Sequence, residues 1–120
     1  MPKRLTQNFT QDEFLCPCCG DCGIEIDFVM ELQAIRTRVG FPLAVNSGWR
    51  CEEHNEKISP KSKGDHVRGY AVDVQCSSRY KRAEILQHAL NSGFFKDIAI
   101  GKSFIHLGRG KSKQGIGVYA

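Results

Sequence analysis

The strongest structural signal in the chain is the segment Gly64-Asp65-His66-Val67-Arg68-Gly69-Tyr70-Ala71-Val72-Asp73. Its second half has an alternating pattern, which predicts a β-strand over residues 70–75 with Asp73 on one face of the sheet and two valines on the other. His66 is expected in the loop that enters this strand. A turn at Gly69 would bring the His66 imidazole and the Asp73 carboxylate to one site.

A second segment, Ser103-Phe104-Ile105-His106-Leu107-Gly108, supplies another candidate metal ligand. His106 is expected on a separate strand of the same sheet. Imidazole and carboxylate are zinc ligands, and three protein ligands leave a fourth position for water or substrate, as in catalytic zinc sites. We therefore interpret His66, Asp73 and His106 as the ligands of one zinc ion, which predicts a metallohydrolase.

Two alternatives compete with this interpretation. Each of the three residues can be an ordinary hydrogen-bonded polar group, although burying Asp73 in an apolar strand without a partner is costly. Two histidines and a carboxylate also form the iron site of iron(II) oxygenases. Those sites place the first histidine two residues before the carboxylate and use larger β-barrels, whereas His66 and Asp73 are seven residues apart in a short chain. The oxygenase interpretation is therefore not favoured.

Size and composition restrict the domain organisation of the chain, its location and the kinds of partner that it can bind. The chain has 120 residues, 41% of them hydrophobic and 25% charged, which predicts a single domain over residues 1–120 and a monomer. It contains no apolar run of the roughly 20 residues that span a bilayer, and no secretory signal, so synthesis in the cytoplasm is expected. The net charge of +4 suits an anionic polymer. Nucleic acid is not expected, because no aromatic residues interleave with the basic ones.

Periodicity predicts an α+β fold, with a small, mainly antiparallel sheet packed with two main helices. The main helices are expected at residues 28–39 and 79–92, a short helix at 51–58, and strands at 43–47, 70–75, 98–100, 104–107 and 116–119. Asp27 and Ser78 are expected to cap the starts of the main helices. The core-facing residues are expected to be Phe28, Leu32, Ile35 and Val39 in the first helix and Ala83, Leu86 and Leu90 in the second.

Cysteines are concentrated in an N-terminal loop, residues 16–23. Four cysteines lie in this loop and two stand apart: Cys16, Cys18, Cys19 and Cys22, then Cys51 and Cys76. The loop contains two overlapping C-x-x-C pairs, so a structural zinc knuckle completed by Cys51 or Cys76 is one interpretation. A surface loop of free or partly oxidised thiols, disulfides included, is the other. Both interpretations stay open at the level of sequence.

The chain also resembles a known family. Residues 66–73 match the H-x-x-G-x-A-x-D segment of zinc D-Ala-D-Ala carboxypeptidases and related murein peptidases, whose fold is shared with some phage endolysins and the hedgehog signalling domain. The resemblance spans roughly residues 8–108 and includes the segments Asn46-Ser47-Gly48-Trp49-Arg50 and Phe104-Ile105-His106. It implies a hedgehog-like or D-Ala-D-Ala-peptidase-like fold.

The resemblance also implies an activity, a zinc-dependent peptidase cleaving peptidoglycan stem peptides as a carboxypeptidase or an endopeptidase. His66, Asp73 and His106 would be its zinc ligands, and Arg50 would face the carboxylate or carbonyl of the substrate. Peptidoglycan peptides would be the partner. An enzyme of the endolysin type would act on the cell wall after release from the cell in which it is made.

Several positions depart from the family pattern. Gly64 replaces a serine, and Ile58-Ser59 replaces a pair of glycines. Neither Ser103 nor Gly108 provides the general base that many relatives carry near the last ligand. The remaining titratable candidates are Asp65, His54, Asp97 and His88; Asp97 is favoured as the catalytic group, and Asp65 is expected to orient the adjacent ligand. A catalytically inactive, metal-containing binding or phage assembly module is therefore the alternative function.

Overall fold

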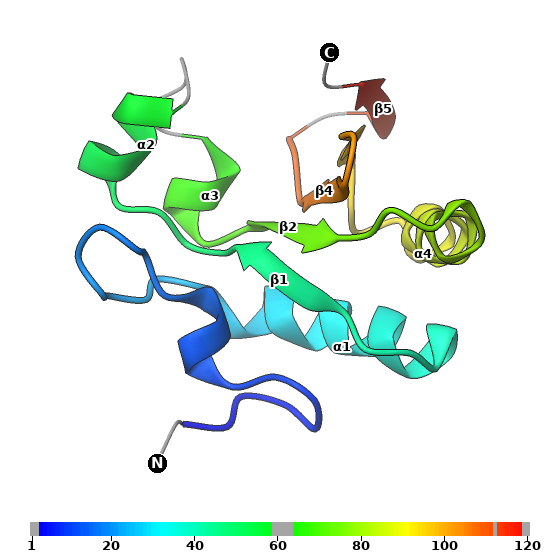
Figure 1. The fold of residues 1–120 in the computed structure, drawn as a ribbon, viewed down its shortest axis with the longest axis horizontal. Helices are drawn as coiled ribbons and strands as arrows, with labels where there is room; N and C mark the ends of the chain where they lie inside the picture. The colour runs from blue at the N-terminus through cyan, green and yellow to red at the C-terminus, as the bar shows by residue number, and fades with distance from the viewer. Residues whose placement is uncertain (1–2, 59–63, 112, 119–120) are drawn as a thin grey trace.

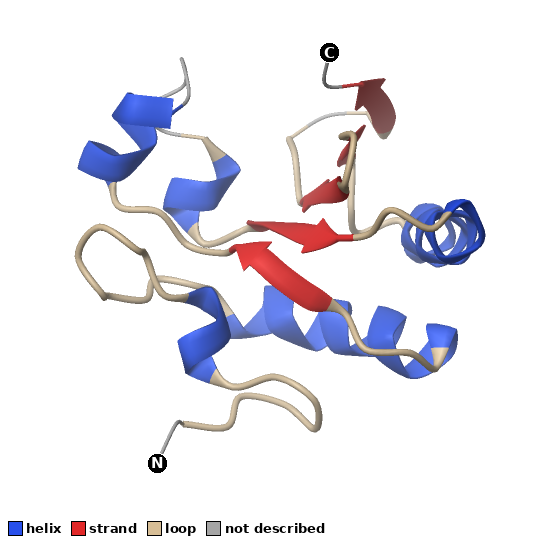
Figure 2. Cartoon of the chain, viewed as in Figure 1, coloured by secondary structure: helices blue, strands red, loops and turns tan. Residues whose placement is uncertain are grey.

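A computed structural model describes residues 3–58, 64–111 and 113–118 of the chain (Figure 1). One short 3-10 helix, four α-helices and five strands follow in the order η1 (Gln11–Phe14), α1 (Ile26–Val39), β1 (Ala44–Ser47), α2 (Glu52–Ile58), α3 (Asp65–Arg68), β2 (Ala71–Gln75), α4 (Arg79–Ser92), β3 (Asp97–Ile100), β4 (Phe104–Gly108) and β5 (Gly115–Val118). The strands form one sheet (Figure 2). The predicted α+β class is confirmed.

The sheet has the strand order β1-β2-β4-β3-β5. Its first three pairings are antiparallel, and only β3 and β5 run parallel. The last predicted strand, 116–119, corresponds to β5, although Tyr119 lies outside the described residues. The sheet is therefore mainly antiparallel, as predicted.

Helix α1 buries the apolar stripe that its sequence predicts. Phe28, Leu32 and Ile35 are fully buried, and Gly40 ends the helix in the left-handed conformation, donating its backbone N–H to a carbonyl of the last turn. The expected cap is wrong in detail. Asp27 lies inside the first turn, because the helix already begins at Ile26.

Helix α4 begins and ends as predicted, and most of its predicted stripe faces the core. The Ser78 hydroxyl accepts a hydrogen bond from the Lys81 backbone N–H. Ile85 and Ala89 are the buried residues of the helix, whereas Ala83, which was expected to face the core, is exposed. Leu86 and Leu90 pack against the core as predicted, so of the three predicted positions Ala83 alone is wrong. Helices α1 and α4 pack against each other beside the sheet.

His66 lies on a helical turn and not in the predicted loop. The four residues of α3 form this turn, and Gly69 ends it with a φ of +84°. No L-residue adopts this φ readily, and a Cβ at Gly69 would also lie 2.1 Å from the Gly23 carbonyl oxygen. The turn places His66 beside β2. Ser59, which stands where relatives carry glycine, lies outside the described residues.

The two faces of the sheet have different roles. Buried apolar side chains of β2, β3 and β4 join the core with α1 and α4: Val72, Val74, Ile98, Ile105 and Leu107. The alternate residues point to the opposite face. There the register pairs Asp73 with His106 and Asp97 with Gly108. The candidate site is thus built on the face of the sheet opposite the main core.

Candidate metal centre

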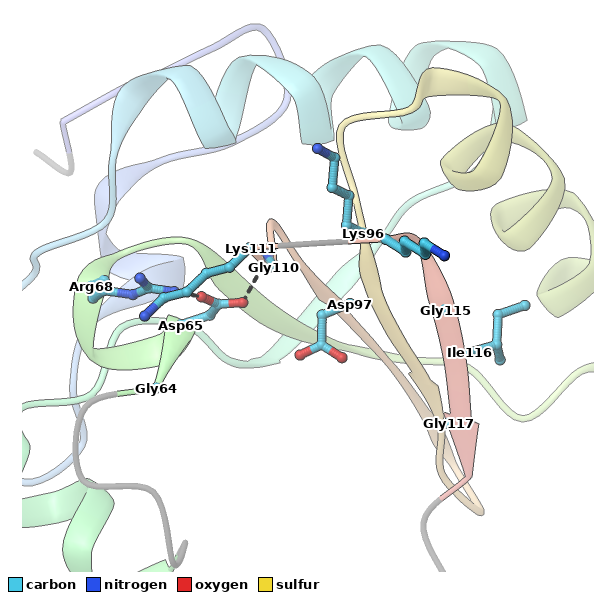
Figure 3. A pocket seen from close by; sticks show the side chains of 11 residues that line it. Gly64, Asp65, Arg68, Lys96, Asp97, Gly110, Lys111, Gly115, Ile116 and Gly117 are labelled. Carbon is cyan, nitrogen blue, oxygen red and sulfur yellow. Dashed lines mark hydrogen bonds and ion pairs between the residues drawn. The ribbon is translucent and has the colours of Figure 1, made fainter.

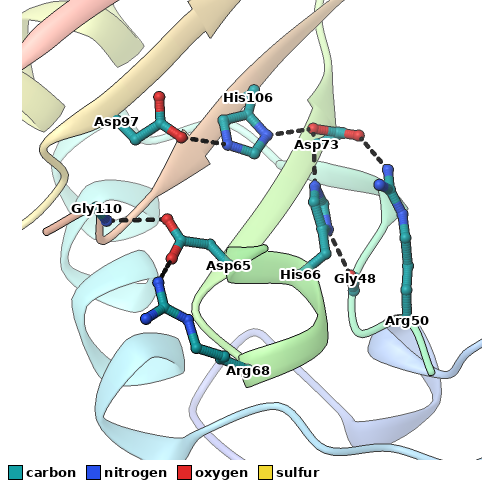
Figure 4. A network of polar contacts seen from close by, with 9 residues as sticks. All are labelled: Gly48, Arg50, Asp65, His66, Arg68, Asp73, Asp97, His106 and Gly110. Atoms are coloured by element: carbon teal, nitrogen blue, oxygen red, sulfur yellow. Dashed lines mark hydrogen bonds and ion pairs between the residues drawn. The ribbon is translucent and has the colours of Figure 1, made fainter. Parts of the chain in front are cut away.

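The three predicted ligands meet at one place. One donor atom from each of His66, Asp73 and His106 lies within 4.8 Å of the other two. Asp73 Oδ1 is 2.9 Å from His106 Nδ1 and 3.5 Å from His66 Nε2 (Figure 4). Cross-strand register brings Asp73 and His106 together, and α3 adds His66 from the side. Residues 40 positions apart in the sequence are thereby joined into one group of donors.

The spacing of these atoms fits a small divalent ion. Two ligand atoms about 2.0 Å from a tetrahedral zinc ion are about 3.3 Å apart, which lies between the two observed separations from Asp73 Oδ1. Imidazole nitrogen and carboxylate oxygen are also the donors that zinc accepts. The residues present therefore fit a three-ligand zinc site with a fourth position for water or substrate.

The orientation of His66 depends on a backbone group. Its Nδ1 lies 2.7 Å from the Gly48 carbonyl oxygen, which leaves Nε2 toward Asp73 (Figure 4). Gly48 itself packs tightly, since a Cβ there would lie 2.6 Å from Phe14 Cα. The prediction that Asp65 orients His66 is not supported, because the Asp65 carboxylate instead contacts Arg68 and accepts from the Gly110 N–H. Sequence reasoning missed the role of Gly48, because every residue has a backbone carbonyl and the residue type does not reveal which one is used.

Arg50 also reaches the centre, as a neighbour of Asp73. Its Nη2 lies 3.1 Å from Asp73 Oδ2, the carboxylate oxygen turned away from His106. Its Nε donates to the Ser47 hydroxyl at 3.0 Å and its Nη1 to the Asn55 side-chain oxygen at 3.3 Å. Both charged side chains of the Arg50–Asp73 pair are mostly shielded from solvent. Arg50 is thus held at the edge of the donor group.

The donors shift one another's protonation equilibria. Burial opposes ionisation of Asp73, but hydrogen bonds from His106 and His66 outweigh it and hold the pKa of this carboxyl well below its usual range. Burial also opposes protonation of His106. Contacts with Asp73 and Asp97 outweigh that effect and raise the pKa of His106 to about 9. A proton on His106 therefore competes with a metal ion at neutral pH.

Asp97 stands on the other side of the His106 ring. Its Oδ2 lies 3.4 Å from His106 Nε2, and the side chain is 58% exposed (Figure 4). Across the strand pair, Gly108 leaves room for two neighbouring groups: a Cβ there would lie 3.0 Å from both Asp65 Oδ2 and His106 Nε2. Carboxylates from α3 and β3 therefore approach the space beside Gly108 and the His106 ring.

A pocket of about 720 Å³ lies between residues of α3, β3 and β5 (Figure 3). Asp65 and Asp97 lie in its wall, and Asp97 links the pocket to the donors through its contact with His106. Four basic side chains also line it: Arg68, Lys96, Lys111 and Lys113. The other two titratable candidates lie elsewhere: His54 is on α2 and His88 is half-buried on α4.

Comparison with known proteins gives the deciding observation. The family model for peptidase M15 matches residues 7–108, a range that includes His66, Asp73 and His106. The chain belongs to the peptidase M15 family. M15 is a metallopeptidase family, which agrees with the fold and with the candidate metal-binding residues. No curated protein matches the chain significantly.

The M15 chain has a second cluster of side chains that could hold a metal ion, at its cysteines. All six cysteines are free thiols, and Cys16, Cys19 and Cys51 lie together. Burial opposes ionisation of Cys16, but backbone N–H groups of Cys51, Cys19 and Cys18 outweigh it and lower the pKa of this thiol to about 7. Cys76, the alternative partner, is instead buried in the main core.

No helix in the described part of this M15 chain combines the length and the apolar character that crossing a bilayer requires.

Proposed function

We propose that this M15 protein is a zinc-dependent peptidase that cleaves peptidoglycan stem peptides. The observation that carries the proposal is the convergence of His66, Asp73 and His106 within 4.8 Å in a chain of a metallopeptidase family. The three residues would hold the zinc ion. Bound there, zinc supplies Lewis acidity and a water molecule whose pKa is lowered to about 7.

Arg50 supports this proposal through its charge and position. Its guanidinium is 3.1 Å from a carboxylate oxygen of Asp73 and keeps its charge at any working pH. It would therefore stabilise negative charge that develops beside the donors, or bind a carboxylate of the substrate. The contacts with Ser47 and Asn55 hold the guanidinium in place before substrate arrives, which lowers the cost of ordering it.

Asp97 is the proposed proton-transfer group. Its carboxylate is largely exposed, lies in the pocket wall and contacts His106 Nε2. A carboxylate at this place can accept a proton from water and deliver it to the leaving amine. The contact with His106 gives Asp97 a second proposed task, orienting the imidazole so that Nδ1 faces the metal.

The pocket supports an anionic peptide as substrate. Its wall carries four basic side chains as well as Asp97, and stem peptides carry free carboxylates that would pair with the basic groups. The proposal covers carboxypeptidase and endopeptidase cleavage of such peptides, and an endolysin would perform it after release from the cell.

Cleavage of defined muropeptides tests the proposal. The purified protein, with and without a chelator, is incubated with stem peptides, and mass spectrometry detects the newly formed amine. We expect chelator-sensitive cleavage that is lost in Asp73→Asn and retained in the control His88→Ala, whose residue lies on α4. Stoichiometric zinc at the triad with no cleavage of any stem peptide would contradict the enzymatic role.

That last outcome would favour the second candidate function, a catalytically inactive binding or assembly module that retains its metal. The observation in its favour is the replacement of the expected base near the last ligand by Ser103 and Gly108. A module of this kind would still bind muropeptides, which equilibrium dialysis against the same peptides would detect.

A further inference from the structure

The cysteine cluster joins two distant parts of the chain. Cys16 and Cys19 belong to the N-terminal loop, and Cys51 directly precedes α2, yet their sulfur atoms all lie within 4.8 Å of one another. The Sγ atoms of Cys16 and Cys51 are 3.7 Å apart. Two thiolates about 2.3 Å from a tetrahedral zinc ion are about 3.8 Å apart, so the observed separation suits two ligands of one ion.

Backbone N–H groups around the cluster donate hydrogen bonds to its sulfur atoms. The N–H of Cys51 donates to Cys16 Sγ at 3.5 Å, and the N–H of His54 donates to Cys51 Sγ at 3.4 Å. Gly20, with φ of +75°, closes the C-x-x-C turn by donating its N–H to the Cys16 carbonyl at 2.8 Å. N–H donors directed at sulfur stabilise the thiolate form, which is the form that binds metal.

We propose that Cys16, Cys19 and Cys51 bind a structural zinc ion that is separate from the His66–Asp73–His106 centre. Thiolate sulfur is a soft donor suited to zinc, and a C-x-x-C pair with a distant third cysteine is a common structural arrangement. The Cys18 thiol, which interacts with Cys51, is a candidate for the fourth position. This inference does not depend on the proposed peptidase activity.

The position of the cluster gives such an ion a defined role. Cys51 directly follows Gly48-Trp49-Arg50, the segment whose carbonyl contacts His66 and whose guanidinium contacts Asp73. The same segment is attached to the N-terminal region by a 3.0 Å hydrogen bond from the Trp49 N–H to the Phe14 carbonyl. A zinc ion bound by Cys16, Cys19 and Cys51 would therefore hold in place the Gly48-Trp49-Arg50 segment, which contacts the other metal centre.

Metal analysis of the full chain, purified under reducing conditions, tests the inference. We expect two zinc ions per chain in the wild type and one in Cys51→Ser, with Cys76→Ser as the matched control that retains both. After exchange with cobalt(II), the wild type and Cys76→Ser should show intense thiolate-to-cobalt charge-transfer absorption, and Cys51→Ser should lose it.

Asp73→Asn keeps the inference testable if Cys51→Ser fails to fold. This variant should retain the thiolate-to-cobalt absorption while losing one metal equivalent, because its change lies in the other centre. Absence of that absorption from both the wild type and Asp73→Asn would overturn the inference. Isolation of the reduced wild type with metal at the triad alone, or of a Cys16–Cys51 disulfide that persists without bound metal, would also overturn it.

Discussion

Asp73 connects three parts of the chain through a single carboxylate. One oxygen contacts both histidines, and the other contacts Arg50. Its two neighbours on β2, Val72 and Val74, point to the opposite face and are fully buried. A change at Asp73 therefore removes a metal donor and also leaves the Arg50 charge without its ion pair, whereas a change at His66 removes a donor and the partner of the Gly48 carbonyl but leaves no charge without its ion pair.

Removal of Asp73 consequently costs more stability than removal of His66. We expect Asp73→Ala and His66→Ala each to lose zinc from the triad, and Asp73→Ala to be further destabilised by about 1–3 kcal/mol, because one partner of a shielded ion pair is left. Metal quantification and urea unfolding of both variants measure these effects. Unchanged zinc content at the triad in both variants would show that the assigned ligands are wrong.

The raised pKa of His106 predicts a pH dependence for chelator-treated protein. The pKa rises from 6.5 to about 9, so protonated His106 stabilises the folded chain. This stabilisation is fully present below pH 6.5 and is lost as pH rises through about 9, a total of about 3 kcal/mol. Urea unfolding between pH 6 and 10 measures it. The Asp73→Asn control should show a much flatter profile, since it lacks the main partner of His106.

Asp97→Asn separates the two tasks proposed for Asp97. If the carboxylate transfers protons, the variant should retain zinc while kcat falls by roughly 100-fold or more and the acidic limb of the pH–rate profile is lost. If Asp97 only orients His106, zinc affinity should fall by about 10- to 100-fold, with the pH profile unchanged. A variant with wild-type kcat, pH profile and zinc affinity would exclude both tasks.

Sequence reasoning found the residues whose chemistry is specific to their side chains. Histidine and aspartate at positions 66, 73 and 106 signalled a metal site by type and spacing. The contact between Gly48 and His66 could not be found in this way, because any residue type offers a carbonyl. The geometry between Asp97 and His106 depends on cross-strand register, which one sequence does not specify to within a residue.

Helix α3 is the element whose sequence was hardest to interpret. Four residues are too few to show a helical period, so the sequence predicts a loop at His66 and a turn at Gly69, where the structure has one helical turn that Gly69 ends. In α4 the polar composition obscured the stripe, and Ala83 was assigned inward where Ile85 is buried. Both long helices and all five strands were otherwise predicted, because their periods and capping residues are distinct.

Gly69→Ala tests the turn that carries His66. The substitution imposes a side chain at φ +84° and places its Cβ 2.1 Å from the Gly23 carbonyl oxygen. The control Gly93→Ala imposes a similar φ, +72°, with no atom within 4 Å of the Cβ. We expect the control to cost about 1 kcal/mol and Gly69→Ala to cost at least about 2 kcal/mol more, measured by urea unfolding. Equal losses would show that the turn accommodates a side chain.

At the scale of the whole molecule, metal binding should contribute measurably to stability. A zinc ion at either proposed site would bind the folded chain alone, and free zinc at about 1,000 times its Kd would stabilise that state by roughly 4 kcal/mol. Treatment with a chelator should therefore lower the Tm by roughly 15 °C for each ion removed, and added zinc should restore it. Calorimetry measures both changes. A Tm unaffected by a chelator that has removed all zinc would contradict this linkage.

Because β5 lies at the edge of the sheet, its hydrogen bonds should open more readily than those of the inner strands. All four residues of β5 are exposed, Val118 by 80%, and the strand pairs with β3 alone at the end of the strand order. The metal donors of β2 and β4 lie in the sheet interior. Amide protons of β5 should therefore exchange with solvent sooner than those of β2 and β4. Because Gly115, Ile116 and Gly117 line the pocket, such local opening would reshape the pocket wall while the donors remain in place.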